Sequence, residues 1–164
     1  SHGMEVGLAY HYGDTGFGVL STATLRQALA EAGVVRRVLI LSACHSGVFV
    51  PALASPDTAI LTAAAKTRTS FGCVAENDWT FFGDALVNRA LRQPVPLEEA
   101  ARSAARSVAA WEAAARVMPS LPQVSIGARA RGWLPQLEAG MPPEASAPVG
   151  RPAFDAAQFA AGES

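Results

Sequence analysis

The sequence predicts an α/β fold in which a mostly parallel sheet carries helices on both faces. Two short runs, residues 37–43 and 58–63, are rich in aliphatic and β-branched side chains, which is typical of buried strands. Helix-like segments alternate with these runs, and this alternation favours a parallel sheet. Half of the 164 residues are apolar, which is enough for one compact domain with a core.

The first half of the chain is predicted to hold a hairpin and two short helical segments beside the strands. Residues 5–20 combine aromatic residues with several glycines, which is typical of a β-hairpin or loop attached to the sheet. Residues 22–32 predict a helix, because two leucines lie four positions apart and a glycine follows as a stop. Residues 48–53 allow at most a short helical turn, since a proline interrupts them.

The second half is predicted to hold two longer helices and a last strand. Residues 79–92 place several apolar side chains on one helical face. Residues 97–117 predict a long helix that begins after a proline, with two glutamates in the first turn, where the helix dipole favours acidic groups. Residues 124–127 form the last predicted strand.

The chain divides into two parts that differ in composition. We expect one folded domain over residues 1–139 and a tail over residues 140–164. The tail is rich in proline, alanine and glycine, and this composition predicts poor order.

Charge and cysteine content exclude several classes of protein. The 13 basic and 14 acidic side chains give a net charge of −1, which offers no basic field for nucleic acid. No run approaches the roughly 20 apolar residues that a membrane-spanning helix needs. The two cysteines, Cys44 and Cys73, do not make a disulfide framework, and we expect both to be free and Cys73 to be buried.

The strongest candidate for a functional site lies at the end of the first buried strand. The apolar run 38–41 stops at Ser42-Ala43-Cys44, followed by small and polar residues. The carboxyl end of a strand is the usual place for a site in an α/β sheet. The chain also carries His2 in a glycine turn, Ser1-His2-Gly3.

A cysteine and a histidine at one end of a sheet can perform nucleophilic catalysis. The thiolate is the reactive form, and a free thiol with a pKa of roughly 8.5 supplies little of it at neutral pH. A neighbouring imidazole can take the proton and later pass it to a leaving amine. Glycine beside the histidine lets backbone approach the substrate, and backbone N–H groups can hold an oxyanion.

From the residues alone, other interpretations stay open. A cysteine at a strand end is more often a small buried residue, and a Ser-His-Gly start also occurs in remnants of cloning. A metal site would have to combine His2, His11, Cys44, His45 and Cys73, whose spacings match no common zinc pattern. A serine hydrolase acting through Ser46 lacks the G-x-S-x-G elbow.

Several ordered segments together resemble the legumain (asparaginyl endopeptidase) family of caspase-like cysteine peptidases, in particular its bacterial members. The resemblance covers roughly residues 1–127. The segments that carry it are Ser1-His2-Gly3, Leu41-Ser42-Ala43-Cys44-His45-Ser46-Gly47, Ala59-Ile60-Leu61-Thr62-Ala63-Ala64, Arg68-Thr69-Ser70-Phe71-Gly72-Cys73, Phe81-Phe82-Gly83-Asp84, Trp111-Glu112 and Ser120-Leu121-Pro122-Gln123.

This resemblance implies a caspase-like three-layer sandwich and a cysteine endopeptidase that uses a Cys–His dyad and a thioacyl-enzyme. Cys44 would be the nucleophile, His2 the general base and acid, and the N–H groups of Gly3 and Cys44 the oxyanion donors. No metal or organic cofactor is implied, and the partner is a peptide or protein substrate. The resemblance further places Ser42, Ser70 and Asp84 at the first specificity pocket, while His45 would line the cleft. Ser42 stands where legumain itself carries an acid, so a strict asparagine preference does not carry over.

Caspase-like sheets have strands before the one that ends in the histidine. We expect an N-terminal fragment or a second chain to complete the sheet here. Two alternative functions remain: a peptidyl transferase or transamidase of the same family, and a caspase-like binding module without turnover. The sequence does not distinguish cytoplasmic from periplasmic or secreted location.

Overall fold

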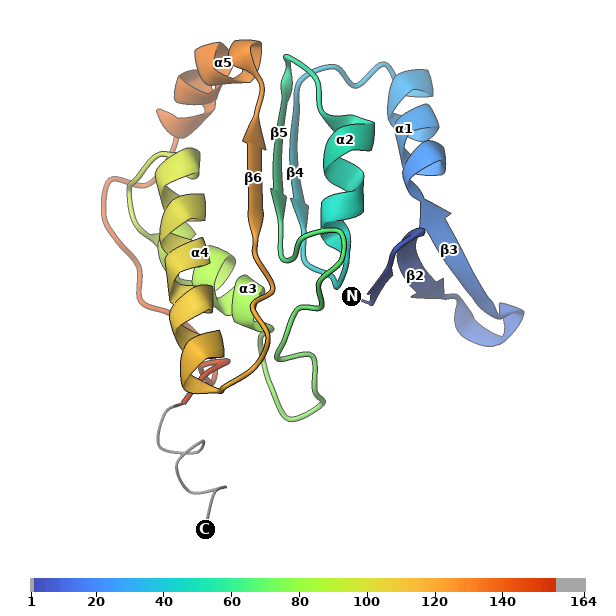
Figure 1. Cartoon of the computed structure of the whole chain (residues 1–164). Coiled ribbons are helices and arrows are strands. Elements are labelled where there is room, and N and C mark those ends of the chain that lie inside the picture. Colours follow the sequence, from blue (N-terminus) through green and yellow to red (C-terminus); the bar gives the residue numbers. More distant parts are fainter. Residues whose placement is uncertain (1, 156–164) are drawn as a thin grey trace.

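The computed structural model describes residues 2–155, which form a mixed α/β structure (Figure 1). The strands are β1 (Gly3–Met4), β2 (Gly7–His11), β3 (Phe17–Ser21), β4 (Arg37–Leu41), β5 (Thr58–Thr62) and β6 (Gln123–Ile126). The α-helices are α1 (Thr22–Glu31), α2 (Phe49–Leu53), α3 (Phe81–Gly83), α4 (Leu97–Ala114) and α5 (Ala128–Glu138). The π-helical segment η3 (Asp84–Arg89) and the 3-10 segments η1 (Gly13–Thr15), η2 (Ser46–Val48) and η4 (Ala90–Arg92) complete the helical elements.

Two small sheets replace the single, mostly parallel sheet that the sequence predicts. One has the strand order β1-β2-β3, and the other has the order β4-β5-β6. Of these pairs only β4 and β5 run in parallel, whereas β1–β2, β2–β3 and β5–β6 are antiparallel. The expectation of a mostly parallel sheet is therefore not met in residues 2–155. The reason is connectivity. A hairpin joins β2 to β3, which makes these strands antiparallel. Two helical stretches separate β5 from β6, so the chain enters β6 in the direction opposite to β5.

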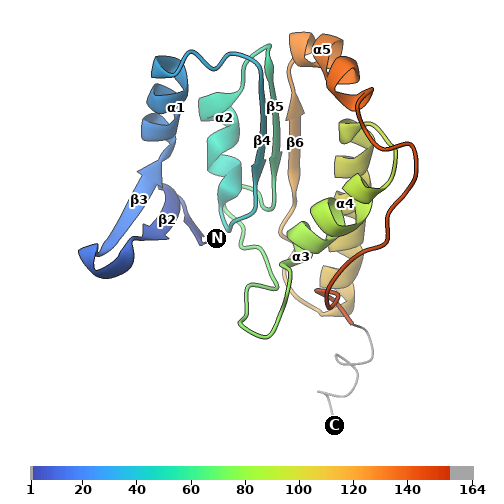
Figure 2. The same cartoon turned by 180° about the vertical axis from the view of Figure 1, so that it is seen from behind.

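Helices pack on both faces of the β4-β5-β6 sheet, as expected. Figures 1 and 2 show α1 and α2 on one side and α3, α4 and α5 on the other. Successive residues of a strand point to opposite faces. Accordingly, Ile60 of β5 joins the cluster with Phe49 and Leu53 of α2, while Ala59 and Leu61 join the larger cluster with α4 and α5. Every residue of β5 is buried, which makes it the central strand of the core.

The hairpin and the first helix form as the sequence predicts. Strands β2 and β3 pair in register from Gly7↔Ser21 to His11↔Phe17. Ser21 caps α1, since its Oγ accepts a hydrogen bond of 3.1 Å from the N–H of Thr24. Gly33 ends this helix in the left-handed conformation, with φ 66°.

The predicted helix at 79–92 begins at Phe81 and is not regular. Its middle, η3, is π-helical, and its end, η4, is a 3-10 turn. Thr80 caps its start, because its Oγ1 accepts a hydrogen bond of 3.0 Å from the N–H of Gly83. Segments of π-helix occur often near functional sites.

The C-terminal part departs most from the sequence-based expectation. Helix α5 was not predicted, and it contains Pro135, a residue that usually disfavours a helix interior. Residues 146–154 contact the folded part, although the composition after residue 140 predicts poor order. Ala153 is buried in the larger core cluster, and Phe154 stacks on Trp111 with ring centroids 6.1 Å apart. Buried polar groups and an aromatic partner hold this segment despite its composition. The rest of the expected tail, residues 156–164, lies outside the described residues.

Among the described helices, none combines the length and apolar character that crossing a membrane requires.

Candidate functional site

Cys44 lies three residues after the end of β4, at the carboxyl edge of the sheet. The residue before it, Ala43, is buried, and Cys44 itself is half-buried. The backbone N–H of Ser70 donates a hydrogen bond to the Cys44 Sγ at 3.2 Å. The same sulfur lies 3.6 Å from both the carbonyl oxygen and the Oγ of Ser70. The structure thus brings two of the predicted site residues together around the sulfur.

Gly3 lies directly against the cysteine. A Cβ built on Gly3 would overlap the carbonyl oxygen of Cys44 and would also come within 3.0 Å of the Ala43 Cβ. No residue other than glycine fits this approach without a shift of backbone. His2 precedes Gly3, is exposed, and accepts a hydrogen bond of 2.9 Å from the N–H of Ala9 at its carbonyl oxygen. The N-terminal turn is therefore held between β2 and the cysteine.

Ser42 contacts a residue that the sequence analysis did not single out. Its Oγ lies 3.2 Å from the Oγ1 of Thr80, so one hydroxyl donates to the other. Thr80 also caps the helix that begins at Phe81, which ties the turn before Cys44 to the start of α3. A threonine directly before an apolar helical stretch is an N-cap signal, and that signal was available in the sequence.

His45 follows the cysteine and has an unusual backbone. Its φ of 56° and ψ of 10° lie in the left-handed region, which residues other than glycine adopt rarely. Its Nδ1 lies 3.0 Å from the carbonyl oxygen of Lys66.

Asp84 lies in a different environment from the other predicted pocket residues. Its side chain is fully buried and is bound by three groups: the Asn88 amide at 2.7 Å, the Arg89 Nε at 3.2 Å and the backbone N–H of Ala153 at 2.9 Å. Asp84 therefore joins α3 and η3 to the C-terminal segment. The described contacts of its carboxylate do not include Cys44, Ser42 or Ser70.

The two remaining candidates lie on the surface. Cys73 is exposed, which contradicts the expectation that it is buried; it sits in the loop between Gly72 and Phe81, away from the packed strands. Both cysteines are free, as expected. His11 is exposed at the end of β2. Within residues 2–155, no three histidine, cysteine or acidic side chains gather closely enough to hold a metal ion.

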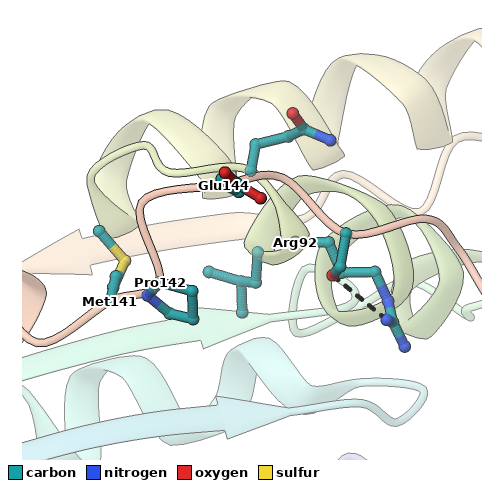
Figure 3. Close-up of a pocket in the computed structure, with 7 residues that line it drawn as sticks. Arg92, Met141, Pro142 and Glu144 are labelled. Atoms are coloured by element: carbon teal, nitrogen blue, oxygen red, sulfur yellow. Dashed lines mark hydrogen bonds between the residues drawn. The ribbon is translucent and has the colours of Figure 1, made fainter.

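One hollow of about 130 Å³ lies away from these residues. Figure 3 shows it between the end of η4 and the start of the C-terminal segment, with Arg92, Met141, Pro142 and Glu144 around it. Arg92 donates a hydrogen bond of 3.4 Å to Ser146 across this hollow. None of the predicted site residues lines it, so it is not part of the candidate site.

Comparison with known proteins gives a family. No curated protein matches the chain. Residues 1–128 of the 164 match the Peptidase C13 family, and this range contains His2, Gly3, Cys44 and Ser70. The chain, whose cysteine stands at a sheet edge against a glycine turn, belongs to the Peptidase C13 family, the legumain family of peptidases.

Proposed function

We propose that this chain carries the catalytic site of a cysteine endopeptidase that cleaves peptide bonds through a Cys44–His2 dyad. Membership of the Peptidase C13 family suggests cysteine peptidase activity. The observation that carries the finer proposal is the packing of the His2-Gly3 turn against the Cys44 backbone. Gly3 contacts the Cys44 backbone directly, and His2 is the residue immediately before Gly3.

The proposed reaction divides amide hydrolysis into two acyl transfers. The Cys44 thiolate attacks the scissile carbonyl carbon, and the carbonyl oxygen takes up the negative charge. The protonated His2 imidazole gives its proton to the leaving amine, and a thioester with Cys44 remains. Water, deprotonated by His2, then attacks the thioester, which releases the acid and restores the thiol.

Oxyanion stabilisation is assigned to the backbone N–H groups of Gly3 and Cys44. The close approach of the two segments supports this, because a side chain at Gly3 would push the turn away from the cysteine. Backbone donors directed at a developing oxyanion contribute strongly, since they need no reorganisation during the reaction.

The specificity pocket is proposed to be lined by hydroxyl groups. Ser70 borders the Cys44 sulfur. Ser42 forms a hydrogen bond with Thr80, which lies one helical turn before Asp84. The Asp84 carboxylate is engaged by Arg89 and buried, so it offers no unpaired negative charge for a basic side chain. We therefore propose that the residue before the cleaved bond is uncharged and polar.

A strand from another segment or chain is proposed to complete the β4 edge. In the described part, β4 pairs with β5 alone, and Ile40 in its middle is 39% exposed. An open edge with apolar residues is a template for strand pairing. Mixing this chain with synthetic peptides of alternating apolar pattern and following hydrogen exchange of the β4 amides tests this. Slower exchange at β4 supports an added strand, and unchanged exchange contradicts it.

The main experiment measures acylation and cleavage together. Wild type, Cys44→Ala and His2→Ala are incubated with a peptide series that varies the residue before the cut among Asn, Gln, Ser, Lys and Asp. Mass spectrometry follows both the products and the mass of the intact protein. We expect cleavage after uncharged polar residues, a transient acyl adduct on Cys44, and loss of both in the two variants.

The alternatives give different products in the same experiment. With an added amine nucleophile, a transferase would yield mainly the peptidyl amide, whereas a hydrolase yields mainly the acid. A binding module would retain peptides without forming an adduct. Cleavage that persists in Cys44→Ala would overturn the proposal.

A further inference from the structure

The residue after the nucleophile holds two segments of chain together. The backbone N–H of His45 donates a hydrogen bond of 2.8 Å to the carbonyl oxygen of Arg68. Its Nδ1 lies 3.0 Å from the carbonyl oxygen of Lys66. A carbonyl oxygen only accepts, so Nδ1 carries the proton and donates. His45 therefore binds the segment 66–68 from both its backbone and its ring.

The left-handed backbone of His45 makes both bonds possible. In this conformation the N–H and the side chain leave the turn in directions that an extended or helical residue does not offer. Residues in sparsely populated backbone regions persist where the surroundings hold them, and they gather at active sites. The two hydrogen bonds to the segment 66–68 are such surroundings.

Further bonds join the same two segments on either side of His45. The N–H of Gly47 donates to the Ala64 carbonyl at 2.8 Å, and the N–H of Ala64 donates to the Ser46 Oγ at 3.3 Å. At the other end, the N–H of Ser70 donates to the Cys44 sulfur. The segment 64–70 thus runs beside the cysteine turn, with His45 binding its centre.

We infer that His45 is a positioning residue that holds the segment 66–70 so that the Ser70 N–H points at the Cys44 sulfur. This inference rests on the proposed function. An N–H directed at sulfur favours the negative charge that the thiolate carries before attack and regains when the thioester breaks. Without the ring bond to Lys66, His45 keeps only its backbone bond to Arg68, which leaves the segment freer to shift and to carry the Ser70 amide away from the sulfur.

Three substitutions distinguish the contribution of the His45 ring from that of the His45 backbone. Glycine, asparagine and aspartate all accept the left-handed region. In His45→Asn the side-chain amide can donate to the Lys66 carbonyl, whereas His45→Gly has no donor and His45→Asp presents only acceptors. The variants are made in a Cys73→Ser background, because Cys73 is exposed and would take up label.

The first readout is the rate of Cys44 alkylation by iodoacetamide, followed by intact mass. We expect His45→Gly to lower this rate and kcat by about tenfold, the size of effect expected when one hydrogen bond to a charged group is weakened. KM should change less than kcat, and the melting temperature should stay near that of wild type. His45→Asn should recover most of the lost rate. If His45→Gly does not fold, His45→Asp takes its place and should be slow as well.

The inference is overturned if His45→Gly alkylates as fast as wild type, or if His45→Asn is as slow as His45→Gly in equally stable proteins. Failure of the proposed function looks different. Turnover that survives in Cys44→Ala would remove the peptidase role of Cys44, while the alkylation rates of the His45 variants would still report on the Ser70 contact.

Discussion

At the scale of single residues, the candidate site depends on how closely backbone approaches backbone. Gly3 abuts the carbonyl of Cys44, and the Ser70 amide reaches the sulfur. Neither contact uses a reactive side chain other than the thiol itself. The geometry of the candidate site therefore depends on the missing Cβ at Gly3 and on the backbone conformation at Ser70 as much as on the choice of nucleophile.

Gly3→Ala should reduce peptide cleavage by about 100-fold, because a displacement of about 1 Å at a reacting centre has that effect. The added methyl would overlap the Cys44 carbonyl oxygen and force the His2 turn outward. Gly132→Ala is the matched control, since a Cβ there meets no atom within 4 Å and Gly132 lies within α5. Steady-state cleavage rates and unfolding midpoints of both variants check this; equal activities would contradict the tight approach.

Thr80→Val should destabilise the fold by about 1 kcal/mol, the usual cost of a lost N-cap. Valine keeps the shape of threonine but removes the hydroxyl that binds Gly83 and Ser42. Thr80→Ser keeps that hydroxyl and should stay close to wild type. Urea unfolding of the three proteins measures the difference. Equal midpoints for valine and serine would show that the cap contributes nothing.

At the scale of elements, α5 is attached to the start of β5 by polar contacts. Arg129 donates from its Nε to the Asp57 carboxylate at 2.9 Å, and the N–H of Ala130 donates to the Pro56 carbonyl at 2.8 Å. The hydrogen bond from Arg129 holds the pKa of Asp57 below its ordinary value of 3.8, although desolvation pushes it upward. Together with Ala130 and Leu134, which are buried in the larger core cluster, these contacts hold α5 in place.

The Asp57–Arg129 pair should make stability depend on pH in the acid range. Because the folded pKa of Asp57 is lowered, its contribution is present above its ordinary pKa and is lost as pH falls through the lowered value. Asp57→Asn should therefore lower the urea midpoint at neutral pH, and the difference should shrink between about pH 5 and pH 2. The effect should be modest, since Arg129 is largely exposed.

The control for this pair is a double-mutant cycle with Arg129→Gln. The double variant should lose no more stability than the two single variants lose together. The coupling energy between Asp57 and Arg129 should vanish at low pH. A difference between wild type and Asp57→Asn that stays constant from neutral to acid pH would contradict the assignment.

At the scale of the whole molecule, the C-terminal segment closes the larger core. The side chain of Asn88 is buried and binds both the N–H and the carbonyl oxygen of Val149, at 2.8 and 3.0 Å. Trp79 donates to the same carbonyl at 2.9 Å. Ala153 and Phe154 then cover Phe81 and Trp111. Residues more than 60 positions apart in the chain thus share one partly buried polar cluster.

Asn88→Ala should destabilise the protein by about 1–3 kcal/mol, because it removes the three hydrogen bonds that the buried Asn88 amide forms with Asp84 and Val149. For a chain of this length that corresponds to a fall in melting temperature of roughly 2–4 °C per kcal/mol. Thermal unfolding followed by circular dichroism measures it. Val87→Ala serves as the comparison, since Val87 is 43% exposed on the same element. An equal, small fall in both would mean that the segment at 149 adds little to stability.

Much of the fold was predictable because it rests on local signals. Aromatic residues and glycines indicate the hairpin, and continuous apolar runs indicate β4 and β5. Helices α1 and α4 have recognisable ends, at Gly33 and at Pro96. Helix α5 and the segment 146–154 were not predictable in this way. Their attachment depends on Asp57, Asp84 and Asn88, whose partners lie far away in sequence.

The sequence by itself determined the family and the most conspicuous candidate residues, Cys44 and His2, because these follow from ordered motifs along the chain. Only the tertiary structure decided the direction of β6, the burial of Asp84 beneath the C-terminal segment, and the contact of Ser70 with the sulfur. The physical reason is that pattern and propensity act over a few residues. Strand direction, by contrast, follows from how the intervening helices return, and the partner of a buried polar group is whichever distant segment supplies the missing donor or acceptor.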